Sequence, residues 1–274
     1  MTTLPSIAII GTGSMGGAIL QGLLDPSVTV DGGIRVTNRT EAKAAPLRTN
    51  GVESFALETT PDANTRAVRG AKVVLIGVKP AMVVDTLAGI ADALEPDAIV
   101  ISVAAGVTTA TMESAVTGSV LRAMPNTPAI VGLAVTGLSA GSRSTDEQLA
   151  IGRAVFETVG SVLEVPESQI DALSTISGSG PAYVFYLVEE FTKTAIGMGF
   201  TADQAELLVN GTFRGAVELL AASDKSPEEL RRQVTSPKGT TERAIAELEA
   251  ADLSATFSRA TAAALARAKE LAAG

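Results

Sequence analysis

Residues Ile7–Leu20 read Ile-Ala-Ile-Ile-Gly-Thr-Gly-Ser-Met-Gly-Gly-Ala-Ile-Leu. Four apolar residues run directly into a set of glycines, and the apolar spacing beyond them suits a helix. In such an arrangement Gly11 permits a sharp turn, Gly13 lets the backbone approach a phosphate, and Gly16 lets the helix pack closely on the strand. The free N–H groups at the helix start then face an anion. The stretch predicts a dinucleotide site; the alternative, in a chain with 26 glycines, is an ordinary glycine-rich turn.

The composition of the chain excludes several kinds of chemistry. With 274 residues, 46% of them hydrophobic, the chain can form one large domain or two. It contains neither Cys nor His, so disulfides, thiolate nucleophiles, His-based triads and Cys- or His-ligated metals are excluded. We expect no metal.

Charge and hydropathy also restrict the partners and the location. The net charge of −9 without a basic cluster argues against a nucleic-acid partner. No apolar run reaches the ~20 residues of a membrane span, and the N-terminus lacks the pattern of a signal peptide. We therefore expect a cytoplasmic protein with no membrane partner.

Further apolar runs repeat the first pattern and alternate with helix-type stretches at 81–94 and 146–158. Continuous apolar runs are typical of strands covered on both faces. The alternation predicts a doubly wound α/β sheet with its ligands at the carboxyl ends of the strands, where Lys79, Ser102 and Ala104 fall. The strands expected after Ile7–Ile10 are Ile34–Thr37, Val73–Val78, Ala98–Val103, Ser119–Arg122, Ala134–Leu138 and Ser161–Val165.

The second expected strand ends in Asn38-Arg39-Thr40. In an NAD-preferring site an acidic residue about 20 positions past the glycines binds the ribose 2′-hydroxyl. Here the first carboxylate is Glu41. Arg39 suits a 2′-phosphate instead, because a guanidinium can bind it with two parallel hydrogen bonds. We therefore expect NADPH to be preferred, with NADH possible; the alternative is a solvated loop arginine.

Two prolines restrict the loop Ala123-Met124-Pro125-Asn126-Thr127-Pro128 and fix its backbone. Two interpretations of this loop remain open. In one it is a structural turn, and in the other Asn126 or its neighbours hold the nicotinamide end of the cofactor.

From Pro166 the strand pattern stops and helix signals follow, which predicts a nucleotide-binding domain at 1–165 and a helical domain at 166–274. Ser177–Pro181 is expected to begin a helix, with the proline in its first turn. The segment Tyr183–Phe191 is apolar over most of its circumference. Such a helix must be buried, and we expect it to form the core of a dimer.

Capping residues predict where the later helices begin. Thr201 with Gln204, and Ser226 with Glu229, each fit a capping box. Ser254 is expected to cap the last helix.

Between two of these helices lies Val234–Glu242, which gathers hydroxyl side chains, a proline and a glycine. The hydroxyls and the free N–H groups of the following helix would form an anion cradle suited to a carboxylate. The alternative is plain helix capping by Thr240. The concentration of hydroxyls favours a substrate site.

Taken together, these stretches resemble the pyrroline-5-carboxylate reductase family over essentially the whole chain and in order. The glycine turn is shared with many dehydrogenases, whereas Met124–Pro128 and Thr235–Thr241 are much more specific to the family. The stretches that carry the resemblance are Gly11–Gly17, Val78–Pro80, Ala104–Gly106, Arg122–Pro128, Ser177–Tyr183 and Val234–Thr241.

The resemblance implies a fold and an assembly. An N-terminal Rossmann domain would precede an all-helical dimerisation domain that interleaves with that of a partner, and in the family such homodimers often assemble further into rings. The implied cofactor contacts are Gly11, Thr12, Gly13, Ser14, Met15, Gly16, Asn38, Arg39, Asn64, Val78, Lys79, Pro80, Val103, Ala104 and Ala105.

The resemblance also implies a reaction, hydride transfer from NADPH to the C=N carbon of 1-pyrroline-5-carboxylate to give proline. Thr241 would lie close to the ring nitrogen and is preferred over Lys79, which could act as a general acid but fits cofactor contact equally well. The family commonly has Gly where this chain has Lys238, which puts the backbone shape of the loop in question. The implied substrate-binding residues are Ser236, Lys238, Gly239, Thr240 and Thr241.

Related enzymes and one non-enzyme remain as alternatives. A related imine reductase or a β-hydroxyacid dehydrogenase would share the layout, but the latter needs a lysine base early in the helix after Ser177–Gly180. The first lysine there is Lys193, beyond three helical turns. A non-catalytic NADP-sensing regulator would not need the second loop at Ser236–Thr241. The preferred interpretation is a two-ligand cleft built between the domains.

Overall fold

The computed structural model describes residues 2–49 and 51–273, which form two compact units. One unit holds the chain up to Ser179 together with the chain from Ala264 onward, and the other is Gly180–Ala263. Within the described residues no helix is both long and apolar enough to cross a membrane.

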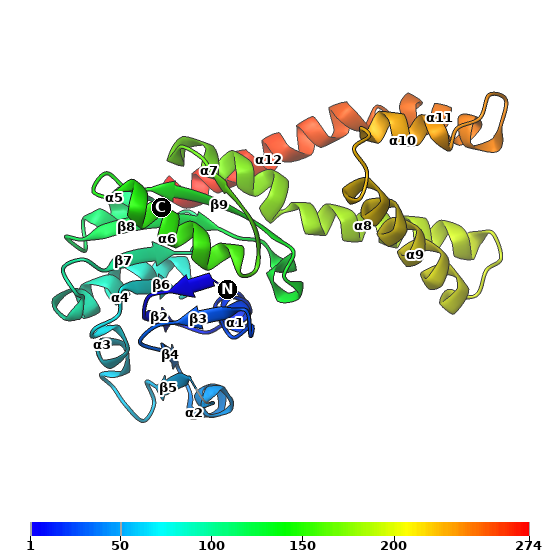
Figure 1. The fold of residues 1–274 in the computed structure, drawn as a ribbon. Helices are drawn as coiled ribbons and strands as arrows, with labels where there is room; N and C mark the ends of the chain where they lie inside the picture. Colours follow the sequence, from blue (N-terminus) through cyan, green and yellow to red (C-terminus); the bar gives the residue numbers. More distant parts are fainter. Residues whose placement is uncertain (1, 50, 274) are drawn as a thin grey trace. The chain divides into compact units, whose positions relative to one another are not determined.

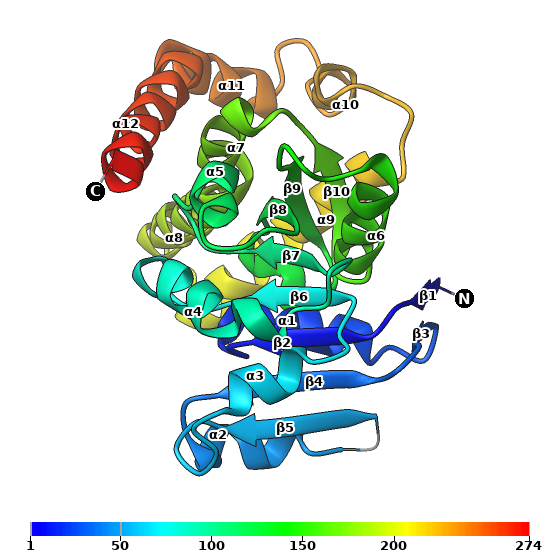
Figure 2. The same cartoon turned by 90° about the vertical axis from the view of Figure 1, so that its left-hand side faces the viewer.

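The first unit is built on a sheet with the strand order β10-β9-β8-β7-β6-β2-β4-β5 (Figure 2). Neighbouring strands pair in parallel except β8 and β9, which are antiparallel. The strands are β2 (Ile7–Ile10), β4 (Ile34–Asn38), β5 (Val52–Ala56), β6 (Val73–Ile76), β7 (Ile99–Ser102), β8 (Ser119–Met124), β9 (Ala134–Ala140) and β10 (Gly160–Glu164). A separate pair is formed by β1 (Thr2–Leu4) and β3 (Val28–Val30).

Helices cover both faces of this sheet. The α-helices of the unit before its π-helix are α1 (Ser14–Leu23), α2 (Glu41–Ala44), α3 (Ala63–Val68), α4 (Val83–Ile90), α5 (Thr109–Glu113), α6 (Asp146–Glu157) and α7 (Glu167–Leu173). Short 3₁₀ turns lie at η1 (Ala45–Leu47), η2 (Pro80–Met82), η3 (Ala91–Ala93) and η4 (Thr127–Val131), and the π-helix η5 spans Ser174–Gly178.

The first strand shows why its sequence is apolar without interruption. Ile7 and Ile9 belong to the hydrophobic core that α1 and α6 cover, whereas Ala8 and Ile10 belong to the core that α3, α4 and α5 cover. Successive side chains of a strand point to opposite faces, so both faces must be apolar when both are covered.

The seven strands expected from the sequence are all present, with ends that differ by at most two residues. The expected helix at 81–94 is divided into η2, α4 and η3. The strands β1, β3 and β5 were not anticipated. β5 lies at the edge of the sheet and alternates buried and exposed residues, including exposed Glu53, so it lacks the continuous apolar run of the central strands.

The division into compact units falls later than the domain boundary expected near residue 165. β10 ends at Glu164, and the regular elements that follow it as far as residue 273 are all helices. α7 nevertheless packs on β9, and its acidic side chains pair with Arg122 of β8, so the chain as far as Ser179 belongs to the first unit. We retain 1–165 and 166–274 as the proposed domains of the sequence.

The helical unit contains α8 (Gly180–Gly197), α9 (Ala202–Ala221), α10 (Pro227–Gln233), α11 (Thr240–Ala250) and the first half of α12 (Leu253–Ala273) (Figure 1). Its small buried core comes from α8 and α9, where Ala195 packs with Ala205 and Val209. The Phe191 and Phe213 rings also meet edge to face at 6.3 Å.

Both capping boxes predicted in this unit are present, at Thr201 with Gln204 and at Ser226 with Glu229. The prediction for Ser254 was wrong, because α12 begins at Leu253 and Asp252 is the residue that caps it. The Asp252 carboxylate accepts a hydrogen bond from the Ala255 N–H at 3.0 Å. Asp252 lies between the two helices. Its φ of 46° separates α11 from α12, and its carboxylate, a preferred N-cap group, bonds the first turn of α12.

Candidate active site

The glycine turn joins β2 to α1 in the geometry that the sequence suggests. Gly11 has a φ of 89°, in the region that favours glycine. A Cβ on Gly16 would lie 2.5 Å from the Gly11 carbonyl oxygen, so the helix packs here only without a side chain. A Cβ on Gly13 would meet nothing within 4 Å. No side-chain cap is formed at the start of α1 within the described part of the chain, so its first N–H groups remain available for a phosphate.

A cavity of about 510 Å³ opens beside this turn, at the carboxyl ends of β2, β4 and β6. The described residues that form its wall include three cationic side chains, those of Arg39, Lys43 and Lys79, and no acidic one. The expected cofactor residues that line it are Gly11, Gly13, Asn38, Arg39, Asn64, Val78 and Lys79. It is further lined by Ile10, Thr37, Thr40, Lys43, Leu57, Gly77, Met82 and Thr86, which the sequence analysis did not single out.

Two asparagines on this wall are held by hydroxyl groups. The Asn38 Nδ2 donates to the Thr12 hydroxyl and fixes the turn to the end of β4. The Thr37 hydroxyl donates to the Asn64 Oδ1 at 2.8 Å, and Asn64 lines the cavity with its Nδ2 still available as a donor. Gly77 is required where β6 passes the turn, since a Cβ there would lie 2.6 Å from the Gly11 oxygen.

A second cavity of the same unit, about 440 Å³, lies beyond the ends of β6, β7 and β8. Pro80 and Ala105, both expected to contact cofactor, lie here rather than in the first cavity. The cavity is also lined by Gly106, Arg122, Met124, Asp171, Ser174, Thr175, Ser179, Ala264, Arg267 and Ala268. The remaining expected cofactor residues line neither cavity: Thr12, Ser14, Met15, Gly16, Val103 and Ala104.

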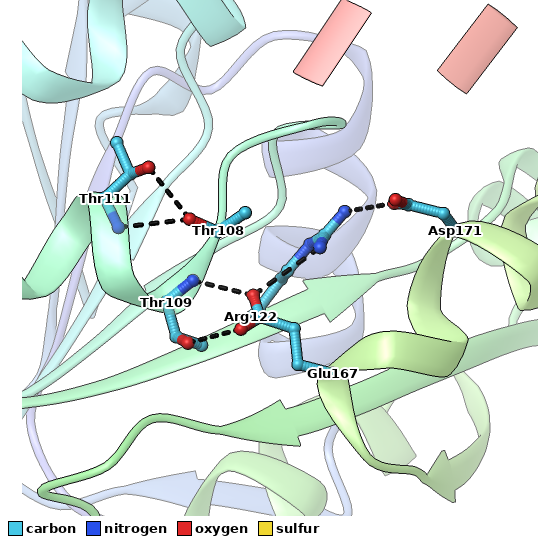
Figure 3. A network of polar contacts seen from close by, with 6 residues as sticks. All are labelled: Thr108, Thr109, Thr111, Arg122, Glu167 and Asp171. Atoms are coloured by element: carbon cyan, nitrogen blue, oxygen red, sulfur yellow. Dashed lines mark hydrogen bonds and ion pairs between the residues drawn. The ribbon is translucent and has the colours of Figure 1, made fainter. Parts of the chain in front are cut away.

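One wall of the second cavity is fixed by a buried charge network (Figure 3). The Arg122 side chain, only 5% exposed, pairs with Asp171 at 2.5 Å and with Glu167 at 3.5 Å. The Glu167 carboxylate also accepts from the Thr109 N–H at 2.7 Å and from the Thr109 hydroxyl. Strand β8 and helices α5 and α7 are thereby joined at one point.

Asn126 has a structural part in this region rather than a free amide. Its Nδ2 donates to the Ser177 carbonyl at 2.9 Å, and its Oδ1 accepts from the Val135 N–H at 2.9 Å. The side chain is buried and joins the end of β8 to η5 and to β9. These bonds favour the structural interpretation of the Met124–Pro128 loop over contact with the nicotinamide.

The Ser177–Pro181 stretch differs from the expected helix start. α8 does begin at Gly180 with Pro181 in its first turn, but the residues before it are already helical, in η5. The chain just before α8 is held by this π-helix, because the Ser179 N–H donates to the Ser174 carbonyl at 2.9 Å. A π-helix often marks a functional site, and Ser174 and Thr175 of η5 line the second cavity.

The loop before α11 has the features of an anion cradle. Gly239 is the N-cap residue and provides no side-chain cap, so Thr240 does not cap the helix. Among the hydrogen bonds of the described residues, none uses the hydroxyl of Ser236, Thr240 or Thr241. A Cβ on Gly239 would lie 2.9 Å from the Ser236 carbonyl oxygen as well as 2.5 Å from its Oγ, which favours glycine there.

Lys238 adopts the backbone conformation that its position in this loop requires. Its φ is 61°, in the left-handed region where glycine is favoured. The Lys238 N–H donates to the Glu242 carboxylate at 2.9 Å, which holds the loop against the first turn of α11. The departure from glycine therefore leaves the loop in a glycine-like shape under local strain.

The helix α8 exposes much of its apolar surface. Phe185 and Tyr186 are 67% and 61% exposed, and Phe191 is 51% exposed. Apolar patches of this kind mark interaction surfaces.

The glycine turn and the cation-lined cavity fit a dinucleotide-binding protein, and the family matches define its class as an NAD(P)-dependent oxidoreductase. The family "NADP oxidoreductase coenzyme F420-dependent" matches residues 6–106, and "Pyrroline-5-carboxylate reductase dimerisation" matches residues 167–271. The chain belongs to the pyrroline-5-carboxylate reductase family, whose known role is in proline biosynthesis. The dimerisation match indicates homo-oligomerisation.

Alignments with pyrroline-5-carboxylate reductases, in sequence and in structure, extend over almost all of the chain. The pyrroline-5-carboxylate reductase of Corynebacterium melassecola is 38% identical over 276 residues, covering 99% of each chain. That of Pseudomonas aeruginosa is 35% identical, covering 98% of this chain and 97% of the relative. A solved pyrroline-5-carboxylate reductase from Coxiella burnetii is 36% identical with a TM-score of 0.87, covering 97% of each chain.

A more distant structure, from Plasmodium falciparum, is described as having NADP bound. It is 23% identical with a TM-score of 0.81, covering 97% of this chain and 98% of that one, and shares the fold.

Proposed function

We propose that this chain reduces the C=N bond of 1-pyrroline-5-carboxylate to give L-proline, with NADPH preferred over NADH as the donor. The observation that carries the cofactor preference is the wall of the first cavity, which has three cationic side chains and no acidic one in a chain of net charge −9. A ribose 2′-hydroxyl is bound by a carboxylate, whereas a 2′-phosphate requires positive charge.

The glycine turn would hold the pyrophosphate of the cofactor, and Asn38 and Arg39 would contact its adenosine end. When bound, NADPH supplies the hydride. A protonated imine is already electrophilic, so the chain's own residues act mainly by orienting the reacting carbon, which fits a protein without histidine.

The Ser236–Thr241 loop is the proposed site for the substrate carboxylate. Its support is the set of hydroxyls without a partner among the described residues, together with the uncapped start of α11. Glu242 lies in the same turn, but its carboxylate is engaged by the Lys238 N–H.

Thr241 is the proposed hydrogen-bonding residue for the ring nitrogen as the imine becomes an amine. Lys79 lines the cofactor cavity, which supports cofactor contact rather than a general-acid role.

The proposed reaction is tested by following NADPH oxidation with 1-pyrroline-5-carboxylate against a panel of other cyclic imines, keto acids and β-hydroxyacids. We expect turnover with 1-pyrroline-5-carboxylate to exceed that with keto acids and β-hydroxyacids by several orders of magnitude. An NADP-sensing regulator would bind NADPH and oxidise it with none of the panel.

Thr241→Val and Thr241→Ser separate the proposed role of the hydroxyl from loop shape. We expect Thr241→Val to lower kcat/KM for the imine by about 10²-fold, within the range for a lost transition-state donor, and Thr241→Ser to retain most of it. NADPH binding should be unchanged in both. Equal activity of Thr241→Val and the wild type would place the hydrogen-bonding residue elsewhere.

We further propose that the homodimers assemble into a ring, as the family resemblance implies. Light scattering on the purified chain decides between a dimer and a larger even-numbered assembly.

A further inference from the structure

The part of the first cavity beyond β4 contains two cations that have no acidic partner. Arg39 follows β4 directly, and Lys43 lies one turn later in α2; both line the cavity. Neither takes part in any ion pair formed by the described residues, although both are exposed and most of the ion pairs there also use an exposed arginine or lysine. Thr40, between them in sequence, adds a hydroxyl to the same wall.

The carboxylate between these cations in sequence is held away from them. Glu41 forms a two-point ion pair with Arg48, through Nη1 to Oε1 and through Nη2 to Oε2 at 2.9 Å. The Arg48 Nε also donates to the Ser54 carbonyl at 3.0 Å, which fixes the guanidinium against β5. The hydrogen bond from Arg48 holds the pKa of Glu41 below its usual value, so Glu41 stays ionised and paired.

The other acid nearby, Glu58, is bound to backbone. Its carboxylate accepts from the Glu41 N–H at 3.0 Å, and its own N–H donates to the Arg39 carbonyl at 3.1 Å. Glu58 thus braces the turn that presents Arg39 and does not line the cavity. Positive charge on this wall is consequently left for a ligand.

We propose that Lys43 is a second phosphate-binding cation, which together with Arg39 binds the 2′-phosphate of NADPH, and that Arg48 preserves this preference by holding Glu41 away. The inference rests on the proposed preference for NADPH and adds the residues that set it. Arg39 alone offers a planar fork to the phosphate, whereas Lys43 adds a point charge from the opposite end of the short turn. A dianionic group is matched by two cations.

Isothermal titration calorimetry with two cofactor fragments tests the proposal without turnover. The probes are adenosine 2′,5′-bisphosphate and adenosine 5′-monophosphate, which differ only in the 2′-phosphate. For Lys43→Gln we expect the Kd of the bisphosphate to rise by about 10-fold, as for loss of one hydrogen bond to a charged group, and that of the monophosphate to stay unchanged. Unchanged monophosphate binding also shows that the variant is folded.

Two comparisons make this result specific. Lys225→Gln removes the same charge from an exposed lysine that does not line the cavity, and should leave both Kd values unchanged. Arg48→Gln should weaken the bisphosphate selectively, because it frees Glu41, and Glu41→Gln/Arg48→Gln should restore binding.

Each contrary result is distinct. If the wild type binds both fragments equally, the NADPH preference itself is wrong, and this inference falls with it. If the wild type prefers the bisphosphate but Lys43→Gln binds it as tightly, the preference stands and the role of Lys43 is overturned. An equal loss in Lys225→Gln would also overturn it, because the effect would then be one of net charge. Failure of the double variant to recover would overturn the part assigned to Arg48.

Discussion

Lys238 has a left-handed backbone conformation that is unfavourable for any residue with a Cβ atom. A non-glycine residue in the left-handed region costs about 1–2 kcal/mol, and the flexibility of glycine in the unfolded chain offsets part of this. We therefore expect Lys238→Gly to raise the free energy of unfolding by about 0.5–1 kcal/mol, seen as a higher midpoint in thermal unfolding at fixed protein concentration. Lys238→Ala keeps the Cβ that causes the strain and removes the rest of the side chain, so it should not stabilise the protein.

Asn126 shows where residue-scale reasoning from sequence stops. The prolines of Met124–Pro128 correctly indicate a rigid loop, but the partners of the amide are backbone groups of Ser177 and Val135, distant in sequence, and no local pattern reveals them. Lys43 was missed for a similar reason. Arg39 lies at a known distance in sequence from the glycine turn, where a residue that binds the ribose is expected. Lys43 lines the cavity because it lies in the short helix α2, which the sequence did not predict.

Asn126→Ala should destabilise the first unit, because it leaves the Val135 N–H and the Ser177 carbonyl without partners in a buried place. The expected loss is about 1–3 kcal/mol in the free energy of unfolding, measured by chemical denaturation. Asn126→Asp keeps the acceptor for Val135 and loses the donor to Ser177, so it separates the two bonds. A variant with full stability and lowered cofactor affinity would instead support contact with the nicotinamide.

At the scale of elements, the Arg122 network joins α5 and α7 to the sheet. Arg122→Met would leave the carboxylates of Glu167 and Asp171, each about a quarter exposed, without their cation. Removing one partner of a buried ion pair costs about 3–5 kcal/mol, and partial exposure of these acids places our expectation at about 2–3 kcal/mol. Denaturant unfolding measures it, and Arg153→Met, at an exposed ion pair, is the control, with a loss below about 1 kcal/mol.

Helices and strands could be predicted correctly where a single local sequence pattern determines them. Continuous apolar runs revealed the central strands, and capping boxes revealed the starts of α9 and α10. The edge strand β5 and the antiparallel pairing of β8 with β9 depend on tertiary partners rather than on local pattern. The π-helix at Ser174–Gly178 has no sequence signal that we can identify.

At the scale of the whole molecule, the exposed apolar surface of α8 predicts that the chain forms an oligomer. Contacts between subunits would then bury this surface and stabilise the helical unit. Phe185→Glu places a charge on this surface, and we expect it to give a smaller species by light scattering with lowered thermal stability. Leu24→Glu, at an exposed apolar residue just after α1, is the control and should keep the wild-type mass. A wild-type chain that is a stable monomer would contradict the prediction.

The central claim is that one protein joins an NADPH site to the reduction of a cyclic imine. The most direct measurement is steady-state kinetics with 1-pyrroline-5-carboxylate and each nicotinamide cofactor, with the product identified by chiral chromatography. We predict one L-proline for each NADPH oxidised, and a kcat/KM with NADPH at least about tenfold above that with NADH, corresponding to about 1.4 kcal/mol. NADPH binding without any proline formed, or equal use of NADH, would contradict the account.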